Sequence, residues 1–345
     1  MTTKTKASER LPFYNFNKIW SYNAYYNFVL GARGTGKTYG AKKKAIKDAI
    51  NKGEQFIYLR RYKTEMTTAR NTFFSDVKQD FPAHEFKIQG NEAMMKRDGQ
   101  WDTIGYFVSL SKAGSQKSVS YPRVTKIIFD EFILNEGAIR YLPDEAILFN
   151  EFYSTVDRYR GQVRVLFLAN SVSIMNPYFL AWDIDYDPHS DWVVSHVSKS
   201  TGRPFIVVHF HDSQVFAAKV FETPFGEFIK NTDYANYAVG NQFQDYDANL
   251  IAKKSSEADY VMTVETKAGT FSVWKNRQDN KWFVQEKLPE QQVIFTLMPN
   301  NMSESKILLY TSDKIFQSVK TAFRQGRLLF DTPVSRNAFR EIFKR

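Results

Sequence analysis

The first two hundred residues alternate short apolar runs with longer stretches of helical periodicity. Strands are expected at 26–30, 55–60, 105–110, 126–130 and 163–170, and several of these runs are apolar throughout, as in parallel strands buried on both faces. Helices are expected at about 37–51, 64–79 and 144–157, and one or two hairpins with turns at QGNE and RDGQ lie between them. This alternation predicts an α/β domain with a mostly parallel sheet and helices on both faces.

The pattern changes after the apolar run at 204–210. Residues 213–252 predict one or two short helices, which we interpret as a linker. From 258 onward, β-rich runs at 259–266, 270–275, 281–287 and 292–298 predict a meander, followed by a helix near 312–325, a strand at 326–331 and a final helix from about 334. We therefore expect one domain over 1–212, a helical linker over 213–252 and a small α+β domain over 253–345.

Composition narrows the class of protein. The 345 residues suit two domains, and the absence of cysteine excludes disulfides and thiolate metal sites, which fits a cytoplasmic protein. No apolar run approaches the ~20 residues that span a bilayer, and the N-terminus does not resemble a secretory segment, so we expect a soluble protein. The net charge of +10 favours a polyanionic partner, although any soluble basic protein shows the same balance.

The string GARGTGKTYG at 31–40 lies between the first predicted strand and the first predicted helix. It satisfies the pattern G-x-x-x-x-G-K-[ST] of a phosphate-binding loop, in which glycines let backbone N–H groups face an anion at the start of the helix. We expect Lys37 to reach the β- and γ-phosphates and Thr38 to offer its hydroxyl to Mg²⁺. The residues expected to enclose the nucleotide are Gly31, Ala32, Arg33, Gly34, Thr35, Gly36, Lys37 and Thr38.

A second motif, KIIFDE at 126–131, is an apolar strand that ends in two carboxylates. Adjacent strand residues point to opposite sides, so the two acids should have different roles. We assign Asp130 to the magnesium ion and Glu131 to the orientation and deprotonation of the attacking water. An alternative, in which the acids cap the next helix, explains one of them but not both.

A complete strand and helix separate the two motifs, so the magnesium strand should not follow the phosphate strand directly along the chain. This order, with Glu immediately after Asp, is typical of the additional-strand catalytic-glutamate (ASCE) class of P-loop ATPases. A GTPase is the competing interpretation, because WDTIG at 101–105 contains Asp-x-x-Gly. The guanine-reading Asn-Lys-x-Asp is missing, and we interpret Asp102 as a hairpin residue.

Two further features fit a motor. Asn170 ends the strand expected beside KIIFDE, at the sheet edge where open α/β sheets bind ligands, and could sense the γ-phosphate or hold the water. The string DRYRGQVR contains Arg158, Arg160 and Arg164. Such arginines are usually solvated, but ring ATPases use one in trans at a neighbour's γ-phosphate, and Arg158 is the first candidate, before Arg160.

Several long strings in order, namely GARGTGKTYG, GEQFIYLRRYK, SVSYPRVTKIIFDEFI, DRYRGQVRVLFLANSVSIMNPYF and GNQF, resemble the DNA-packaging ATPase of small tailed phages of the phi-29-like group. The likeness covers most of the first 250 residues. It implies a homomeric ring, expected to contain five subunits, that is docked on the portal of an empty capsid and pumps double-stranded DNA inward with ATP. The implied location is the host cytoplasm, transiently at the portal vertex, and not the mature virion.

The resemblance also assigns residues. Arg158 matches the arginine that acts in trans, Lys117 matches a second basic residue offered across the subunit boundary, and Arg33 matches an arginine that packaging motors often carry in the phosphate loop. The implied tail domain is similar to the RNase H-like nuclease of large terminases but degenerate. Its last 46 residues carry nine Lys and Arg against four Asp and Glu, which suits an anionic partner such as a structural RNA.

Nuclease chemistry would need three or four converging carboxylates around two metal ions. The tail offers Glu265, Glu286 and Asp331, spread singly over three elements, so we expect no cleavage. A terminase with a working nuclease, a helicase or translocase of the same ATPase class, and a nucleic-acid-binding scaffold with a structural nucleotide remain the alternatives.

Overall fold

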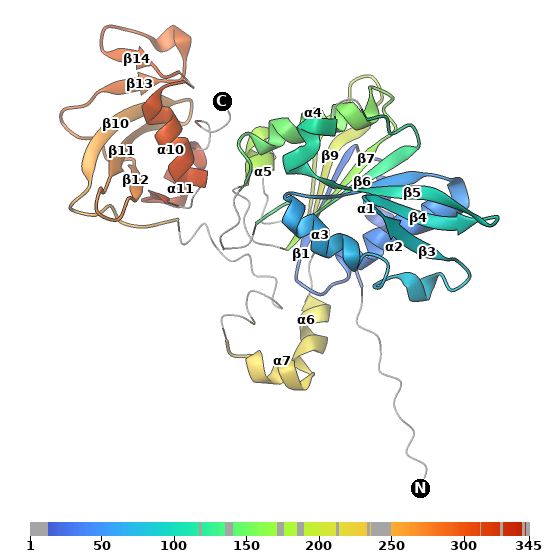
Figure 1. Ribbon diagram of the computed structural model, residues 1–345. Helices are drawn as coiled ribbons and strands as arrows, with labels where there is room; N and C mark the ends of the chain where they lie inside the picture. The colour runs from blue at the N-terminus through green and yellow to red at the C-terminus, as the bar shows by residue number, and fades with distance from the viewer. Residues whose placement is uncertain are drawn as a thin grey trace. The chain divides into compact units, whose positions relative to one another are not determined.

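The computed structural model describes residues 13–116, 119–134, 141–170, 176–184, 190–211, 214–232, 235, 250–310, 312–324, 327–339 and 342. Two compact units make up the chain (Figure 1). One comprises Met1–Leu134, Leu142–Val172 and Asp185–Phe243, and the other comprises Asn135–Tyr141, Ser173–Ile184 and Gln244–Arg345. None of the helices in the described part of the chain is both long enough and apolar enough to span a membrane.

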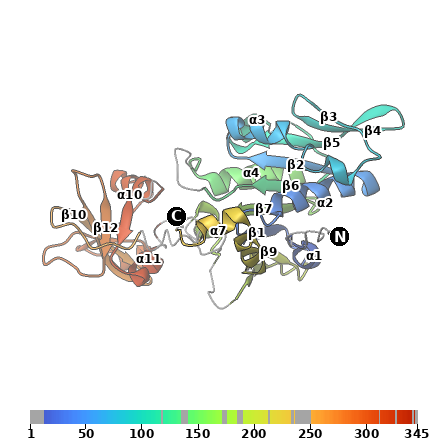
Figure 2. The same ribbon diagram turned by 90° about the horizontal axis from the view of Figure 1, so that it is seen from below.

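Nine of the described strands form the sheet of the first unit, in the order β3-β4-β5-β2-β6-β7-β1-β9-β8 (Figure 2). The central strands β5 (Gln100–Ser109), β2 (Gln55–Arg60), β6 (Val124–Asp130), β7 (Arg164–Asn170), β1 (Tyr26–Gly31) and β9 (Pro204–His211) are parallel. Antiparallel strands complete the edges: β3 (Phe86–Gln89), β4 (Glu92–Arg97) and β8 (Trp192–Val197). The predicted parallel sheet is therefore confirmed, and β7 lies between the strands of the two motifs.

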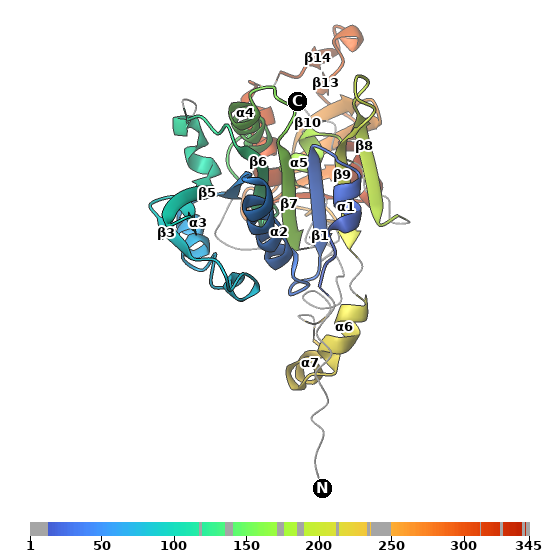
Figure 3. The same cartoon turned by 90° about the vertical axis from the view of Figure 1, so that its right-hand side faces the viewer.

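Helices cover both faces of this sheet. On one face α1 (Asn17–Ser21), α2 (Lys37–Lys52) and α3 (Lys63–Asn71) share a core with the sheet (Figure 3). On the other face α4 (Glu145–Asp157) places the Phe149 ring against Phe129 and Phe167. Because adjacent strand residues point to opposite faces, Ile128 of β6 contributes to the core beneath α2, whereas Phe129 contacts α4 on the other face.

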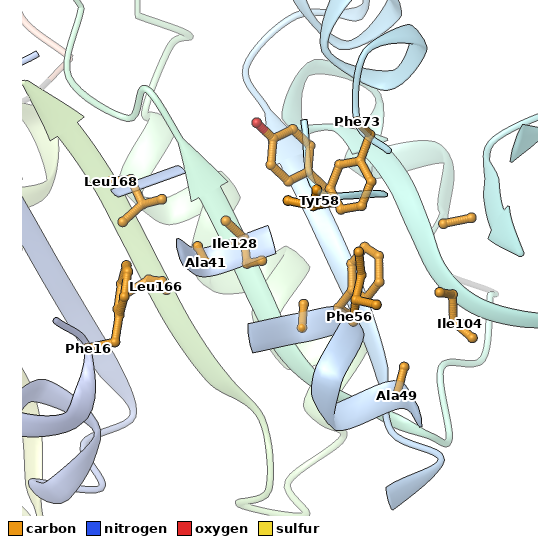
Figure 4. Packing of buried hydrophobic residues seen from close by; sticks show 14 of the residues in the cluster. Phe16, Ala41, Ala49, Phe56, Tyr58, Phe73, Ile104, Ile128, Leu166 and Leu168 are labelled. Carbon is orange, nitrogen blue, oxygen red and sulfur yellow. The ribbon is translucent and has the colours of Figure 1, made fainter. Parts of the chain in front are cut away.

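The core beneath α2 and α3 combines aliphatic side chains with a group of packed aromatic rings (Figure 4). The Phe73 ring stacks on Phe56 with centroids 5.4 Å apart and meets Tyr58 edge-on at 5.2 Å. Gly105 on β5 permits this packing, since a Cβ atom there would lie 2.5 Å from the Phe56 ring. The packing holds β2, whose carboxyl end lies at the same edge of the parallel sheet as the phosphate loop that follows β1.

The helix predicted at 64–79 is shorter than expected. It ends at Asn71 and gives way to turns and a 3₁₀ segment, η1 (Lys78–Asp80). Phe73 packs on the sheet while the next residue, Phe74, stacks on Phe86 of β3, and weak helix formers such as Thr72 surround them. Because Phe73 and Phe74 pack on different strands, the chain leaves the helical conformation before these two residues. Strand β8 and the helices α1 and α5 (Pro177–Ala181) were not expected.

Short elements complete the first unit. A 3₁₀ segment η2 (Leu110–Gln116) follows β5, and the two helices α6 (Gln214–Phe221) and α7 (Pro224–Ile229) follow β9. They lie in the region where one or two short helices were predicted. The predicted hairpin turns are also found, at Gly90 and at Asp98–Gly99, all three with positive φ. Asp102 lies in β5 opposite Met95 of β4, which agrees with its interpretation as a hairpin residue, and its carboxylate pairs with Arg123.

The second unit contains a six-stranded sheet among its described residues, in the order β14-β13-β10-β11-β12-β15. The strands β10 (Asp259–Thr266), β11 (Gly269–Lys275) and β12 (Trp282–Gln285) form the predicted meander. The strands β13 (Ile294–Thr296), β14 (Lys306–Leu308) and β15 (Leu328–Phe330) add parallel neighbours. The elements η3 (Pro299–Asn301), α10 (Lys314–Arg324) and α11 (Pro333–Phe339) complete an α+β unit.

One strand of this unit departs from the prediction. The run at 292–298 was expected to continue the meander, but β13 pairs with β10 in parallel and not with β12. The connection between β12 and β13 is longer than the two to five residues of a hairpin and contains Pro289, so the chain crosses to the other side of the meander.

Candidate nucleotide site

The phosphate loop connects β1 to α2, as its sequence predicts. Gly31 ends the strand, and Gly36 occupies the N-cap position of the helix with φ +76°. Gly34 also has a positive φ, +85°. An L-residue strains at these angles, so glycine is what allows the loop to turn its backbone toward the start of α2. The buried Thr35 hydroxyl donates to the Ala32 carbonyl at 3.1 Å and fixes the loop from inside.

Lys37 is buried in the loop, with 6% of its surface exposed. Its Nζ donates to the carbonyl oxygens of Gly31 and Ala32, at 2.9 and 2.7 Å. Burial lowers the pKa of Lys37 to about 8, and the carboxylate of Asp130 opposes this shift. The ammonium group is therefore held by uncharged carbonyls at the mouth of a cavity where an anion would compensate its burial.

Thr38 and Asp130 meet across the sheet edge. The Thr38 hydroxyl donates to Asp130 Oδ1 at 2.9 Å, although the two residues are 92 positions apart. The Tyr58 hydroxyl donates to the other oxygen of Asp130 at 2.5 Å. A hydroxyl beside a carboxylate offers the hard oxygen ligands that Mg²⁺ prefers, and Tyr58 orients the carboxylate from behind. These residues fit a magnesium site.

Glu131 lies just beyond β6 and has φ +58°, which no side chain adopts without strain. The expectation that strand alternation separates the two acids is wrong here, because Glu131 has left the strand and both carboxylates line one cavity. Arg60, the last residue of β2, bridges them: its guanidinium lies 3.0 Å from Glu131 Oε2 and 3.5 Å from Asp130 Oδ2. The Glu131 side chain remains 54% exposed.

A single cavity of about 400 Å³ collects these groups. It includes Asn170, whose strand β7 pairs with both β1 and β6. Its volume lies in the range that holds a small ligand. The residues that line it are Phe13, Arg33, Gly34, Thr35, Gly36, Lys37, Thr38, Tyr39, Asp130, Glu131, Leu168, Ala169 and Asn170.

Comparisons with known proteins agree with this geometry. The sequence profile described as podovirus DNA encapsidation protein (Gp16) matches residues 8–345. The chain belongs to this podovirus DNA encapsidation family. It is 34% identical over 336 residues to the DNA packaging protein of Bacillus phage phi29, covering 96% of this chain and 97% of that protein.

Two solved structures of phage phi29 resemble this Gp16-family chain. The viral genome packaging motor assembly superposes with a TM-score of 0.62 at 33% identity, and the match covers 96% of this chain and 99% of that chain. The N-terminal domain of the DNA packaging ATPase gives a TM-score of 0.52 at 39% identity, covering 59% of this chain and 97% of that chain. Both the resemblance inferred from the sequence and the fold class are thereby confirmed.

Arg33 lines this cavity, whereas Arg158 and Arg160 lie away from it. Arg158 follows α4, at the amino end of β7, whereas Asn170 at its carboxyl end lines the cavity. Seven strand residues span roughly 20 Å. The exposed Arg158 guanidinium donates to the Val119 carbonyl at 3.3 Å. Within one subunit, this arginine is at the opposite edge of the sheet from the cavity.

Arg160 is engaged differently from Arg158. Its guanidinium donates to the backbone carbonyls of Tyr121, Pro122, Val156 and Asp157. Because its guanidinium is bonded to four backbone carbonyls of its own chain, Arg160 stabilises the turn after α4 and is not available to an adjacent subunit. Of the two candidates, Arg158 is the one that this geometry leaves at the surface. Lys117 and the GNQF string at 240–243 lie outside the described residues.

Tyr58 and Arg60 were missed in the sequence. Both lie in the predicted strand QFIYLR, and the available signal was a charged residue at the carboxyl end of an apolar strand, the edge where ligands bind. Several basic residues of the first unit are paired with acids within the fold. Lys42 pairs with Asp76, Lys43 with Asp80, Lys44 with Asp48 and Arg61 with Glu145.

The acids of the second unit do not converge. Glu265 on β10 pairs with Lys306 on β14 at 2.5 Å. Glu286 accepts from the Thr332 hydroxyl at 3.1 Å, and Asp331 accepts from the backbone N–H of Glu286 at 3.0 Å. Over the described residues, no group of three or more His, Asp or Glu side chains is arranged to hold a metal ion.

Proposed function

We propose that this chain is a viral DNA-packaging motor ATPase, which hydrolyses ATP to move double-stranded DNA into a preformed capsid as a homomeric ring on the portal. The observation that carries the proposal is the single cavity shared by Lys37, the Thr38–Asp130 pair and Glu131. Its family membership and its similarity to the packaging motor of phage phi29 support the same function.

Each residue of the cavity has a role in this proposal. Backbone N–H groups of the loop and the Lys37 ammonium bind the phosphates. Thr38 and Asp130 hold Mg²⁺, which would neutralise charge on the β- and γ-phosphates. Glu131 accepts the proton of the attacking water, and in this structure that carboxylate is bonded to Arg60. Asn170 orients the water or senses the γ-phosphate.

We propose that Arg158 completes the site of the adjacent subunit. Its exposed position at the sheet edge opposite its own cavity supports a role in trans, because it can approach a γ-phosphate only in another copy. Lys117 is proposed for the same boundary from the family resemblance. A ring, which we expect to contain five subunits, follows from this sharing of sites.

The remaining assignments follow from the same proposal. Residues 1–212 form the ATPase domain, 213–252 the linker and 253–345 a domain without nuclease activity. This last domain binds the portal or a structural RNA through its basic surface. DNA is held through its phosphates without base readout, because a packaging motor must pass any sequence. The protein acts in the host cytoplasm, at the portal vertex, and leaves before the virion matures.

Turnover and packaging test the proposal together. The Lys37→Ala variant should lose ATP hydrolysis. It should also fail to package DNA into empty capsids, which is measured as DNA that an added nuclease cannot digest. Its circular dichroism spectrum should match that of the wild type. The matched control is Lys78→Ala, which removes an exposed lysine of η1 in the first unit, and it should keep both activities. Normal hydrolysis by Lys37→Ala would contradict the assigned site.

Mixed rings test the shared site. Arg158→Ala subunits should bind ATP normally but lower the activity of wild-type subunits mixed with them more than dilution does. The control is Arg277→Ala, an exposed arginine of the second unit. Activity in strict proportion to the wild-type fraction would contradict catalysis in trans.

A separate experiment tests the second unit for nuclease activity. The protein is incubated with plasmid DNA and Mn²⁺, and robust cutting would favour a terminase with a working nuclease.

A further inference from the structure

Two aromatic rings line the cavity near the start of α2. Phe13 lies on Gly36, where a Cβ atom would come within 2.7 Å of the Phe13 ring. The ring centroids of Phe13 and Tyr39 are 5.6 Å apart, and both rings line the same cavity as Asp130. The phosphate and metal chemistry proposed above uses neither ring.

Both rings are held in place from behind. The backbone N–H of Tyr14 donates to the Thr35 carbonyl at 2.8 Å, which ties the segment before α1 to the phosphate loop. The buried Tyr14 hydroxyl is 2.8 Å from His209 Nδ1. Tyr39 donates its hydroxyl to Asp80. The Phe13 ring nevertheless remains 54% exposed, so an apolar face is fixed beside a polar cavity.

The chemistry of the cavity gives the direction of a nucleotide. Glu131 and Asn170 contribute polar groups where the γ-phosphate reacts, and the Thr38–Asp130 pair holds the metal ion beside it. A triphosphate whose γ-phosphate reaches Glu131 has its sugar and base at the opposite end of the ligand. Among the lining residues, Phe13 and Tyr39 are the two that offer an aromatic face to a base, and Gly36 has no side chain that would displace the Phe13 ring.

We propose that Phe13 and Tyr39 form the base platform of this site, with the base of the nucleotide stacked on the Phe13 ring. The proposal rests on nucleotide binding at the phosphate loop, as proposed above. Every nucleobase has a flat π-face that stacks on an aromatic ring, whereas the phosphates gain nothing from such a ring. The platform therefore contributes to the binding of ATP and not to that of its phosphates alone.

A pair of ligands separates the two contributions. Equilibrium binding of MgATP and of magnesium tripolyphosphate, which lacks sugar and base, is measured for the wild type and for Phe13→Ala and Phe13→Trp. We expect Phe13→Ala to weaken MgATP by roughly 5- to 100-fold and to leave tripolyphosphate within about twofold. Phe13→Trp should restore MgATP binding. In turnover, Phe13→Ala should raise KM with little change in kcat.

The matched control is Phe228→Ala, which removes a ring that is 82% exposed on α7, and it should bind both ligands as the wild type does. Equal weakening of both ligands by Phe13→Ala would overturn the proposal, because it would mean that the ring only shapes the loop at Gly36. Unchanged MgATP binding would overturn it as well. Wild-type protein that binds neither ligand would instead contradict the proposed nucleotide site itself.

Discussion

The carboxylates of the two compact units have different surroundings. In the first unit, Asp130 and Glu131 line one cavity together with the Thr38 hydroxyl and the Lys37 ammonium. In the second unit, Glu265, Glu286 and Asp331 have separate partners, such as Lys306 for Glu265. Two acids and a hydroxyl that face one cavity can hold a metal ion and activate water, whereas acids paired one by one stabilise a fold.

The difference also shows in what surrounds each carboxylate. Asp130 is oriented by Tyr58 from behind and keeps its other oxygen directed at Thr38. Glu131 has a positive φ, which costs an L-residue about 1–2 kcal/mol, and its side chain is paired with Arg60. The hydrogen bonds of Glu265, Glu286 and Asp331 join separate strands and turns of the second unit. Position in a shared cavity, and not the number of acids, therefore distinguishes the two units.

Removal of a proposed magnesium ligand should have the largest effect. Asp130→Asn takes away a charge that holds the metal ion, and we expect turnover of ATP to fall about a thousandfold or more. Asp331→Asn makes the same chemical change in the second unit and should stay within about twofold. Steady-state hydrolysis at saturating Mg²⁺ measures both. Equal losses in the two variants would abolish the contrast between the units.

A smaller loss is expected from the residue that orients Asp130. Tyr58→Phe keeps the ring packed on Phe73 and deletes only the hydroxyl. The concentration of Mg²⁺ that supports half-maximal turnover should rise by about 10- to 100-fold, as for other groups that orient a metal ligand. Tyr106→Phe on β5 is the control. An unchanged Mg²⁺ dependence in Tyr58→Phe would show that the hydroxyl serves packing only.

The pH dependence of nucleotide binding should follow Lys37. Its pKa is lowered to about 8 by burial, so its charge is lost as the pH rises through that value. Bound phosphates favour the charged form, so MgATP binding should take up a proton above pH 8, and affinity should fall about fivefold from pH 8 to 9. Titration calorimetry in buffers of different ionisation enthalpy measures the proton. Lys37→Arg should bind without this uptake, and equal uptake by both would contradict the assignment.

The smallest effect is expected in the second unit. Glu265→Gln removes the charge partner of Lys306, and the free energy of unfolding should change by less than about 1 kcal/mol. The hydrogen bond from Lys306 lowers the pKa of Glu265, so this stabilisation is present above the ordinary pKa of a glutamate and is lost as the pH falls through the lowered value. Urea unfolding at pH 7 and pH 3 compares the variants. A larger loss at pH 3 than at pH 7 would have the wrong sign.

The sequence predicted the frame of the site well. Apolar strands at 26–30 and 126–130 end in the two motifs, and parallel strands bring their carboxyl ends to one edge, so Lys37, Thr38 and Asp130 could be placed together. Asn170 followed from the same rule, because β7 pairs with β6 as expected. These features depend on local periodicity and on the geometry of a parallel sheet, which a sequence records directly.

Other features depend on packing between distant segments and were not predictable. Nothing in the local sequence indicates that the Phe13 ring packs on Gly36, or that the Tyr58 hydroxyl of β2 donates to the Asp130 carboxylate on β6. The left-handed conformation of Glu131 is likewise set by the contacts around it. The 292–298 run shows the same limit, because a strand pattern does not specify its neighbour in the sheet.

The account depends most on the role of Glu131 as the base for the attacking water. Binding and hydrolysis of MgATP by the Glu131→Gln variant test it most directly, because the amide preserves size and cannot accept the proton. We expect the variant to bind MgATP with an affinity close to that of the wild type and to hydrolyse it at least about a hundredfold more slowly in a single turnover. Single-turnover hydrolysis at the wild-type rate would contradict the account.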